Sequence, residues 1–107
     1  MERTEITFED RVSTIQAYLT RPELLAQLAE ECAELGQAAL KLRRALDGTN
    51  PTPVDRYEAD AHWREEIGDV LLCVAALGPM LDGTLDADIQ KGMEWKAERW
   101  VERLESR

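Results

Sequence analysis

Two short stretches place acidic side chains beside apolar ones at the same spacing. Each has two adjacent acids and a third acid three residues after the second: Glu30, Glu31 and Glu34 in LAEECAELGQAAL (28–40), and Glu65, Glu66 and Asp69 in REEIGDVLLCVAAL (64–77). A helix advances about 100° per residue, so each trio falls within one ~100° arc. Carboxylates beside a core are costly to desolvate unless they are paired or bound to a cation. The pattern therefore predicts either a solvated acidic face or a cation site.

A hard divalent cation would supply the counter-charge that such a cluster needs. Mg²⁺ prefers oxygen ligands, keeps several waters, and is commonly held by carboxylates together with substrate phosphates. Glu31 and Glu34 each precede a residue of one apolar stripe, and Glu66 and Asp69 do the same in the next helix. If these helices pack antiparallel through the stripes, the two acidic rows converge along one edge. Residue spacing alone leaves the choice between a metal site and an acidic surface open.

The elements that must position these acids are four helices, with no convincing strand. Start signals and apolar spacings of three and four predict helices over residues 7–19, 20–47, 60–81 and 84–104. The second helix starts at a capping box, Thr20 to Glu23, and stops at Asp47-Gly48. Its apolar stripe is expected at seven positions: Leu25, Leu28, Cys32, Leu35, Ala39, Leu42 and Leu46.

The third helix is apolar around nearly its whole circumference from Val70 onward, and Pro79 and Gly83 are expected to end it. A helix that is apolar on every side is buried on every side. One chain of 107 residues has little else with which to cover it. We therefore expect an all-α four-helix bundle, formed as one domain over residues 1–107 and completed by oligomerisation into a homodimer or homotetramer.

The composition restricts the class of partner. With 22 acidic and 13 basic side chains, the net charge is −9, which disfavours nucleic acid and anionic membrane as partners. The longest apolar run, Val70–Leu77, is too short to span a membrane, and the charged start of the chain lacks a signal-peptide core. We expect a cytoplasmic protein in which Cys32 and Cys73 are reduced core residues.

The paired acidic motifs resemble those of the MazG-like all-α nucleoside triphosphate pyrophosphohydrolases. RPELLAQLAEECAELGQAALKLRRA (21–45) is similar to the first motif helix of that family, and EEIGDVLLCVAAL (65–77) is similar to the second. The resemblance covers the two central helices. It implies a bundle of the all-α NTP pyrophosphatase type that hydrolyses an NTP or dNTP to the monophosphate and pyrophosphate. The implied cofactor is Mg²⁺, with Mn²⁺ as a possible substitute.

Motif positions of the family imply roles for individual residues. The implied metal ligands are Glu31, Glu34, Glu66 and Asp69. Glu30 would lie beside them as a catalytic residue that orients the attacking water, or as a neighbour that supports the ligands. No nucleophilic side chain is required, because phosphoryl transfer needs mostly positioning and charge stabilisation.

Cationic and aromatic side chains supply candidates for contact with the substrate. Lys41 lies two turns after Glu34 on the same helix face, and Trp63, one turn before Glu66, could stack on a nucleobase. Three further candidates for phosphate contact lie on the last helix: Lys91, Lys96 and Arg99. The family often has a Lys-x-x-x-Asn pattern on this helix, but here Lys91 is followed by Trp95 at the asparagine position. The identity of the nucleotide therefore stays open.

Two other interpretations of the acidic motifs compete with a pyrophosphohydrolase. A di-iron bundle usually needs a Glu-x-x-His pair on each of two helices, whereas His62 is the only histidine and Ala59 precedes it by three residues. A non-enzymatic dimerisation or adaptor module with acidic surfaces would need no metal. Thermal melting with and without Mg²⁺ separates these possibilities, because a specific site is stabilised by mass action.

Overall fold

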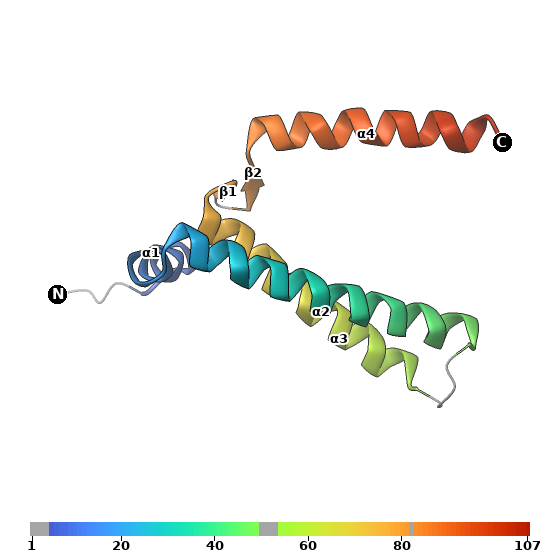
Figure 1. Ribbon diagram of the computed structural model, residues 1–107, viewed down its shortest axis with the longest axis horizontal. Coiled ribbons are helices and arrows are strands. Elements are labelled where there is room, and N and C mark those ends of the chain that lie inside the picture. Colours follow the sequence, from blue (N-terminus) through green and yellow to red (C-terminus); the bar gives the residue numbers. More distant parts are fainter. Residues whose placement is uncertain (1–4, 50–53, 82) are drawn as a thin grey trace.

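The computed structural model describes residues 5–49, 54–81 and 83–107. The elements follow in the order α1 (Phe8–Tyr18), α2 (Arg21–Asp47), α3 (Arg56–Leu77), β1 (Met80–Leu81), β2 (Thr84–Leu85) and α4 (Ala87–Glu105). The described residues thus contain four helices (Figure 1), and the all-α class predicted from the sequence is confirmed. Within these same ranges, no helix combines the length and apolar character that a membrane span requires.

Capping residues set the start of the first two helices as expected. The Thr7 hydroxyl accepts a hydrogen bond from the Asp10 N–H (3.0 Å), and the Asp10 carboxylate accepts one from the Thr7 N–H (2.9 Å). Thr20 and Glu23 form the same reciprocal pair at the start of α2. At the other end of α2, Gly48 adopts the left-handed conformation with φ +74°, which a glycine reaches without the strain of a Cβ.

The boundaries of the third and fourth helices differ from the prediction. Asp55 caps α3, because its carboxylate accepts a hydrogen bond from the Tyr57 N–H (2.8 Å), so the helix begins at Arg56 rather than near residue 60. At its other end, Gly78 takes φ +107° and stops the helix after Leu77. The expected continuation to residue 81 is therefore wrong.

A short hairpin occupies the place where the sequence predicted helix. Met80 pairs with Leu85, and Leu81 pairs with Thr84, in an antiparallel two-stranded arrangement. The next helix, α4, starts only at Ala87, where the Asp86 carboxylate accepts a hydrogen bond from the Asp88 N–H (2.9 Å). The predicted absence of strands is therefore wrong here. Gly78 ends α3 and Asp86 caps α4, so the strand residues between them belong to neither helix.

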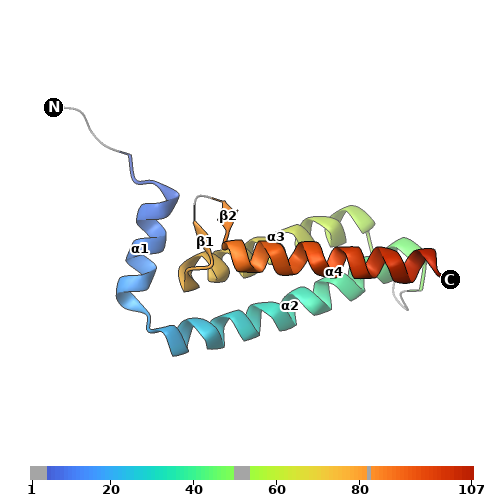
Figure 2. The same cartoon turned by 90° about the horizontal axis from the view of Figure 1, so that it is seen from above.

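The core of the chain is an antiparallel pair formed by α2 and α3 (Figures 1 and 2). Figure 2 shows α1 crossing the end of this pair, where α2 begins and α3 ends. There the Gln16 side-chain amide donates to the Ala76 carbonyl oxygen at 2.9 Å. In contrast, α4 lies apart from α2 and α3 in Figure 1, and none of its described residues is buried.

The face of α2 that meets α3 is rotated relative to the predicted stripe. Buried or half-buried side chains recur at steps of four and three: Leu24, Leu28, Glu31, Leu35, Ala38, Leu42 and Ala45. Leu28, Leu35 and Leu42 belong to both sets, and the predicted Ala39 is also half-buried. The predicted positions Leu25, Cys32 and Leu46 are exposed. The small side chains of Ala38 and Ala59 are buried between the helices. Glu31 therefore occupies a position in the interface itself rather than beside it.

Large apolar side chains remain uncovered in the single chain. On α3, Cys73 is buried, but Leu71 is 44% exposed. On α4, an apolar face holds Ile89, Met93, Trp100, Val101 and Leu104, all of which are exposed. The prediction that Cys32 is a core residue is not met within one chain, since its side chain is exposed.

Candidate metal site

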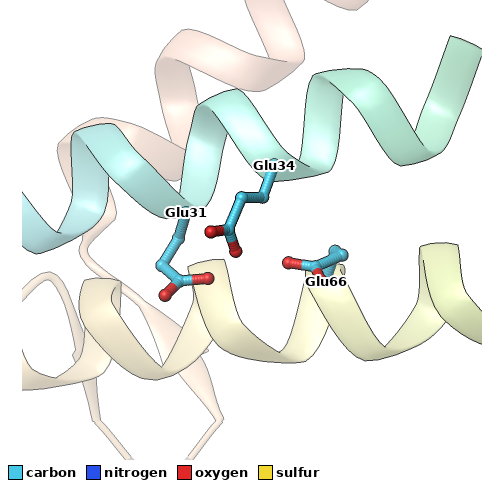
Figure 3. Close-up of side chains that lie close together, drawn as sticks. All are labelled: Glu31, Glu34 and Glu66. Atoms are coloured by element: carbon cyan, nitrogen blue, oxygen red, sulfur yellow. The ribbon is translucent and has the colours of Figure 1, made fainter.

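Three carboxylates from two helices meet at the middle of the α2–α3 interface. Glu31 and Glu34 extend from α2, and Glu66 extends from α3 toward them (Figure 3). One carboxylate oxygen of each residue lies within 4.8 Å of the others. We refer to Glu31, Glu34 and Glu66 as the carboxylate cluster. The antiparallel packing of α2 and α3 produces it, because the two acidic motifs reach the same level of the pair from opposite directions.

The cluster contains oxygens that are buried and have no hydrogen-bond partner. Glu66 is only 8% exposed, and its Oε2 atom is without a partner among the described residues. Glu31 Oε2 is in the same situation, although Glu31 Oε1 accepts a hydrogen bond from the Gln27 amide at 2.8 Å. Unpaired buried carboxylate oxygens cost free energy, so this arrangement needs a counter-charge to be favourable.

Mutual repulsion is evident in the ionisation of Glu34. The negative charges of Glu31 and then Glu66 raise the pKa of the Glu34 carboxyl above its ordinary value, and desolvation acts in the same direction. The imidazole of His62 lies beside the cluster on α3, with its Nε2 atom 3.8 Å from Glu66 Oε1. That distance is longer than a hydrogen bond. The cluster is therefore a region of concentrated negative charge between two helices.

The donor set of the cluster fits a hard divalent cation. All three residues offer carboxylate oxygens, and two of the oxygens in the cluster are buried with no partner among residues 5–49, 54–81 and 83–107. Mg²⁺ and Mn²⁺ favour oxygen donors and accept a small number of carboxylates with water or phosphate completing the shell. A thiolate or imidazole site, as zinc prefers, is not what these three residues provide.

The remaining two acids of the predicted set lie at the margin of the cluster. Asp69 is exposed on α3, one turn after Glu66, and does not belong to the group within 4.8 Å. Its charge nevertheless acts locally: burial, followed by the charges of Glu31 and Asp69, raises the pKa of the Cys73 thiol. Glu30 is exposed on α2 and contributes to the raised pKa of Glu34.

A polar pocket of about 370 Å³ adjoins the cluster on one side. Its lining combines two cluster residues with four neighbours: Glu34, Glu66, Gln37, Ala38, Lys41 and His62. Lys41 was expected near the substrate from its spacing, whereas the positions of Gln37 and His62 in the lining of this pocket were not predicted. Helix spacing carries the signal that would have found them, because Gln37 follows Glu34 by three residues and His62 precedes Glu66 by four.

The other predicted substrate contacts lie outside this pocket. Trp63 is half-buried on α3, and the Arg64 guanidinium lies 5.9 Å from its ring centroid. The three basic candidates of the last helix lie on α4, which is separate from α2 and α3 (Figure 1): Lys91, Lys96 and Arg99. The Arg99 guanidinium lies 4.8 Å from the centroid of the Trp95 ring. Within a single chain, the structure does not bring these cations to the carboxylate cluster.

Comparison with known protein families relates this geometry to an activity. Residues 19–107 match the family described as the MazG nucleotide pyrophosphohydrolase domain. The chain belongs to this MazG family. No curated protein and no solved structure gives a significant match. The resemblance inferred from the two acidic motifs is confirmed, and the match extends beyond those motifs through the hairpin and α4.

Membership of the MazG family establishes the class of reaction. The protein is a hydrolase that acts on nucleotide phosphoanhydride bonds. The matched region begins at residue 19, so α1 lies before it. The prediction of a single MazG-like domain over residues 1–107 is not tested by this match. The hydrogen bond between Gln16 and Ala76, from α1 to α3, is the contact expected if α1 is part of the same domain.

Proposed function

We propose that the protein is a Mg²⁺-dependent nucleoside triphosphate pyrophosphohydrolase that converts an NTP or dNTP to its monophosphate and pyrophosphate. One observation carries this proposal: the carboxylate cluster of a MazG domain holds two buried oxygens that find no partner in the described part of the chain. Such oxygens are unfavourable in a purely structural interface. They suit a site in which charge is supplied by a cation and a bound polyphosphate.

In this proposal Glu31, Glu34 and Glu66 hold the metal from two helices, and Asp69 joins them at the exposed margin. When bound, Mg²⁺ or Mn²⁺ would neutralise charge on phosphate oxygens and lower the pKa of a bound water. The α2–α3 pair keeps the ligands at fixed spacing, because Glu66 and Glu31 are part of its packed interface. Glu30, beside the cluster, orients the attacking water.

Substrate contacts in this proposal come from both helices. Lys41 lines the pocket next to Glu34 and Glu66, where its ammonium group is suited to phosphate oxygens. Trp63 lies one turn before Glu66 on α3 and offers an aromatic face for a nucleobase. Neither contact distinguishes one base from another, so the proposal covers both NTPs and dNTPs.

Oligomerisation is part of the proposal. The exposed apolar face of α4 and the exposed Leu71 are large uncovered surfaces, and burying them favours a homodimer or homotetramer. In such an oligomer, the basic side chains of α4 from one copy would contact the phosphates bound to another copy. Under this proposal Lys91, Lys96 and Arg99 act from a neighbouring copy rather than from the same chain. No nucleic acid or membrane is proposed as partner, and the cytoplasmic location stays a prediction.

A nucleotide panel tests the proposed reaction. Purified protein would be incubated with individual NTPs and dNTPs in Mg²⁺, and both products would be identified by chromatography. We expect monophosphate and pyrophosphate in equal amounts, activity with Mn²⁺, and loss of activity when a chelator removes the metal. Formation of a diphosphate and inorganic phosphate, or turnover that survives chelation, would contradict the proposal.

Two glutamine variants assign the reaction to the cluster. Glu66→Gln removes one proposed ligand, and Glu58→Gln removes an exposed acid from the first turn of the same helix. We expect the first variant to lose turnover and the second to keep it. The two changes alter net charge equally, so a difference in turnover comes from the position of the acid. Equal turnover in both variants would exclude Glu66 as a metal ligand.

A further inference from the structure

The polar pocket beside the carboxylate cluster extends from it in one direction only. Gln37 and Lys41 follow Glu34 by about one and two turns along α2, and His62 precedes Glu66 by about one turn on α3. Because α2 and α3 are antiparallel (Figure 1), all three lie on the same side of the cluster. Asp69 lies on the opposite side, toward the carboxyl end of α3. The two sides of the cluster therefore differ in chemistry.

The lining of this pocket suits an anion better than a nucleobase. Among its six lining residues Ala38 is the only apolar one, and Gln37, Lys41 and His62 carry hydrogen-bond donors. The cavity with mostly apolar lining lies elsewhere, against α1 and the end of α3, where Phe8, Val12 and Ala75 contribute to it. Phosphate oxygens need several donors at once, and a polar pocket next to a metal site can supply them.

His62 is positioned so that it can turn toward an incoming acceptor. Its Nδ1 atom lies 3.9 Å from Glu65 Oε2, and its Nε2 atom lies 3.8 Å from Glu66 Oε1. Both distances exceed those of hydrogen bonds, and about half of the side chain is exposed to solvent. The imidazole therefore lies near the cluster without a hydrogen bond to Glu65 or Glu66.

We propose that this pocket holds the pyrophosphate part of the substrate, and that Gln37 and His62 donate hydrogen bonds to its oxygens beside Lys41. The assignment rests on the proposed function and adds an orientation to it. Hydrolysis adds one water across the α–β anhydride and yields monophosphate, pyrophosphate and a proton released to solvent. The leaving pyrophosphate lies on the Gln37 and His62 side, and the α-phosphate of the monophosphate lies at the carboxylate cluster.

Binding of the two products tests this orientation. Calorimetric titration would measure the affinity of inorganic pyrophosphate, in excess Mg²⁺, for the wild-type protein and for Gln37→Leu and His62→Leu. We expect each substitution to weaken pyrophosphate binding about tenfold, as loss of a charge-assisted hydrogen bond does. The monophosphate product of the best nucleotide in the panel should bind all three proteins equally.

Controls separate this inference from the proposed function. Both substituted side chains are exposed, so helical content by circular dichroism and binding of Mn²⁺ alone should be unchanged. Lys41→Met should also weaken pyrophosphate binding, whereas Arg43→Met, with the same change of charge on the opposite face of α2, should not. If the wild type releases pyrophosphate normally but Gln37→Leu and His62→Leu bind pyrophosphate as the wild type does, this inference is wrong and the proposed function is unaffected.

Two further outcomes are equally decisive. If the variants lose affinity for the monophosphate and keep it for pyrophosphate, the proposed orientation is reversed and the inference is wrong. If the wild-type protein neither releases pyrophosphate from any nucleotide nor binds it in Mg²⁺, the proposed function itself fails. If both variants lose affinity for pyrophosphate, keep it for the monophosphate and still bind Mn²⁺, the assignment of Gln37 and His62 to the pyrophosphate is supported.

Discussion

Glu31 and Glu66 extend toward each other from two antiparallel helices, and each keeps one buried carboxylate oxygen that accepts no hydrogen bond from any described residue. Both side chains occupy positions in the α2–α3 interface that an apolar residue would fill in an ordinary helix pair. These two glutamates therefore make the α2–α3 interface less stable than apolar side chains would. Such a loss of stability is typical of functional sites, where replacing the destabilising residue increases stability and removes activity.

Replacing Glu66 by glutamine should produce these two effects together. The amide keeps the size of the side chain, removes one negative charge, and can donate to the neighbouring carboxylates. We expect the metal-free variant to be more stable by about 1 kcal/mol, the value of one hydrogen bond. Turnover should fall at least about 100-fold, as in other losses of a charge-stabilising group. Melting in chelator and pyrophosphate release are the two measurements, and a lower melting temperature would contradict the explanation.

The raised pKa of Glu34 predicts a pH dependence of the metal-free protein. Repulsion from Glu31 and Glu66 places its folded-state pKa above the ordinary value of 4.5. A group with a raised pKa contributes its full stability below the unfolded value, and that contribution is lost as the pH rises through the folded value. Glu34→Gln should therefore melt like the wild type below pH ~4.5 and at a higher temperature near neutral pH.

Melting curves of both proteins in metal-free buffers of constant ionic strength would measure this difference. Saturating Mg²⁺ at neutral pH should reverse the order, because the Glu34 carboxylate then becomes a ligand and only the wild type gains its full stabilisation. A difference in melting temperature that is the same at every pH would show that repulsion among the three carboxylates is not its origin.

Metal binding should stabilise the wild-type protein beyond the effect of ionic strength. A cation at 100 times its dissociation constant adds about 2.7 kcal/mol, which corresponds to roughly 10 °C for a domain of this size. Asp69 lies outside the group within 4.8 Å, so Asp69→Asn should keep most of this shift while losing turnover. Melting with Mg²⁺ against matched NaCl is the measurement. Complete loss of the shift in Asp69→Asn would show that Asp69 holds the metal as strongly as the three clustered glutamates do.

Local signals in the sequence were sufficient for most of the fold. The capping boxes at Thr7 and Thr20, and the glycine at position 48, act through neighbouring residues, so the limits of α1 and α2 could be predicted. The hairpin was missed because its strands, Met80–Leu81 and Thr84–Leu85, are too short for an alternating pattern. Asp55 and Asp86 are strong capping residues, and greater weight on them would have corrected the starts of α3 and α4.

The site was harder to predict in detail, because it depends on how one helix is rotated against another. Spacing showed that the acids of each helix share a face, but Leu28 and Leu35 fit both the predicted and the observed stripe of α2. Only tertiary packing decides that Glu31 is in the interface and Cys32 is exposed. The roles of Gln37 and His62 depend on the same rotation, which places them against one pocket.

The exposed apolar face of α4 predicts that the protein is not monomeric. Trp100 is 66% exposed on this face, and covering it is a source of association energy. Trp95 is also exposed, but it lies on the opposite face of the helix, under the Arg99 guanidinium. Trp100→Glu should therefore dissociate the oligomer, whereas Trp95→Glu, the same change on the other face, should leave it intact.

Sedimentation velocity at several protein concentrations would measure both variants against the wild type. We expect a dimer or tetramer for the wild type and Trp95→Glu, and a species near the chain mass of 12.2 kDa for Trp100→Glu. If α4 cations act from a neighbouring copy, turnover by Trp100→Glu should fall while the stabilisation by metal alone persists, because the carboxylate cluster lies within one chain. A wild-type protein that sediments only as a monomer would overturn this prediction.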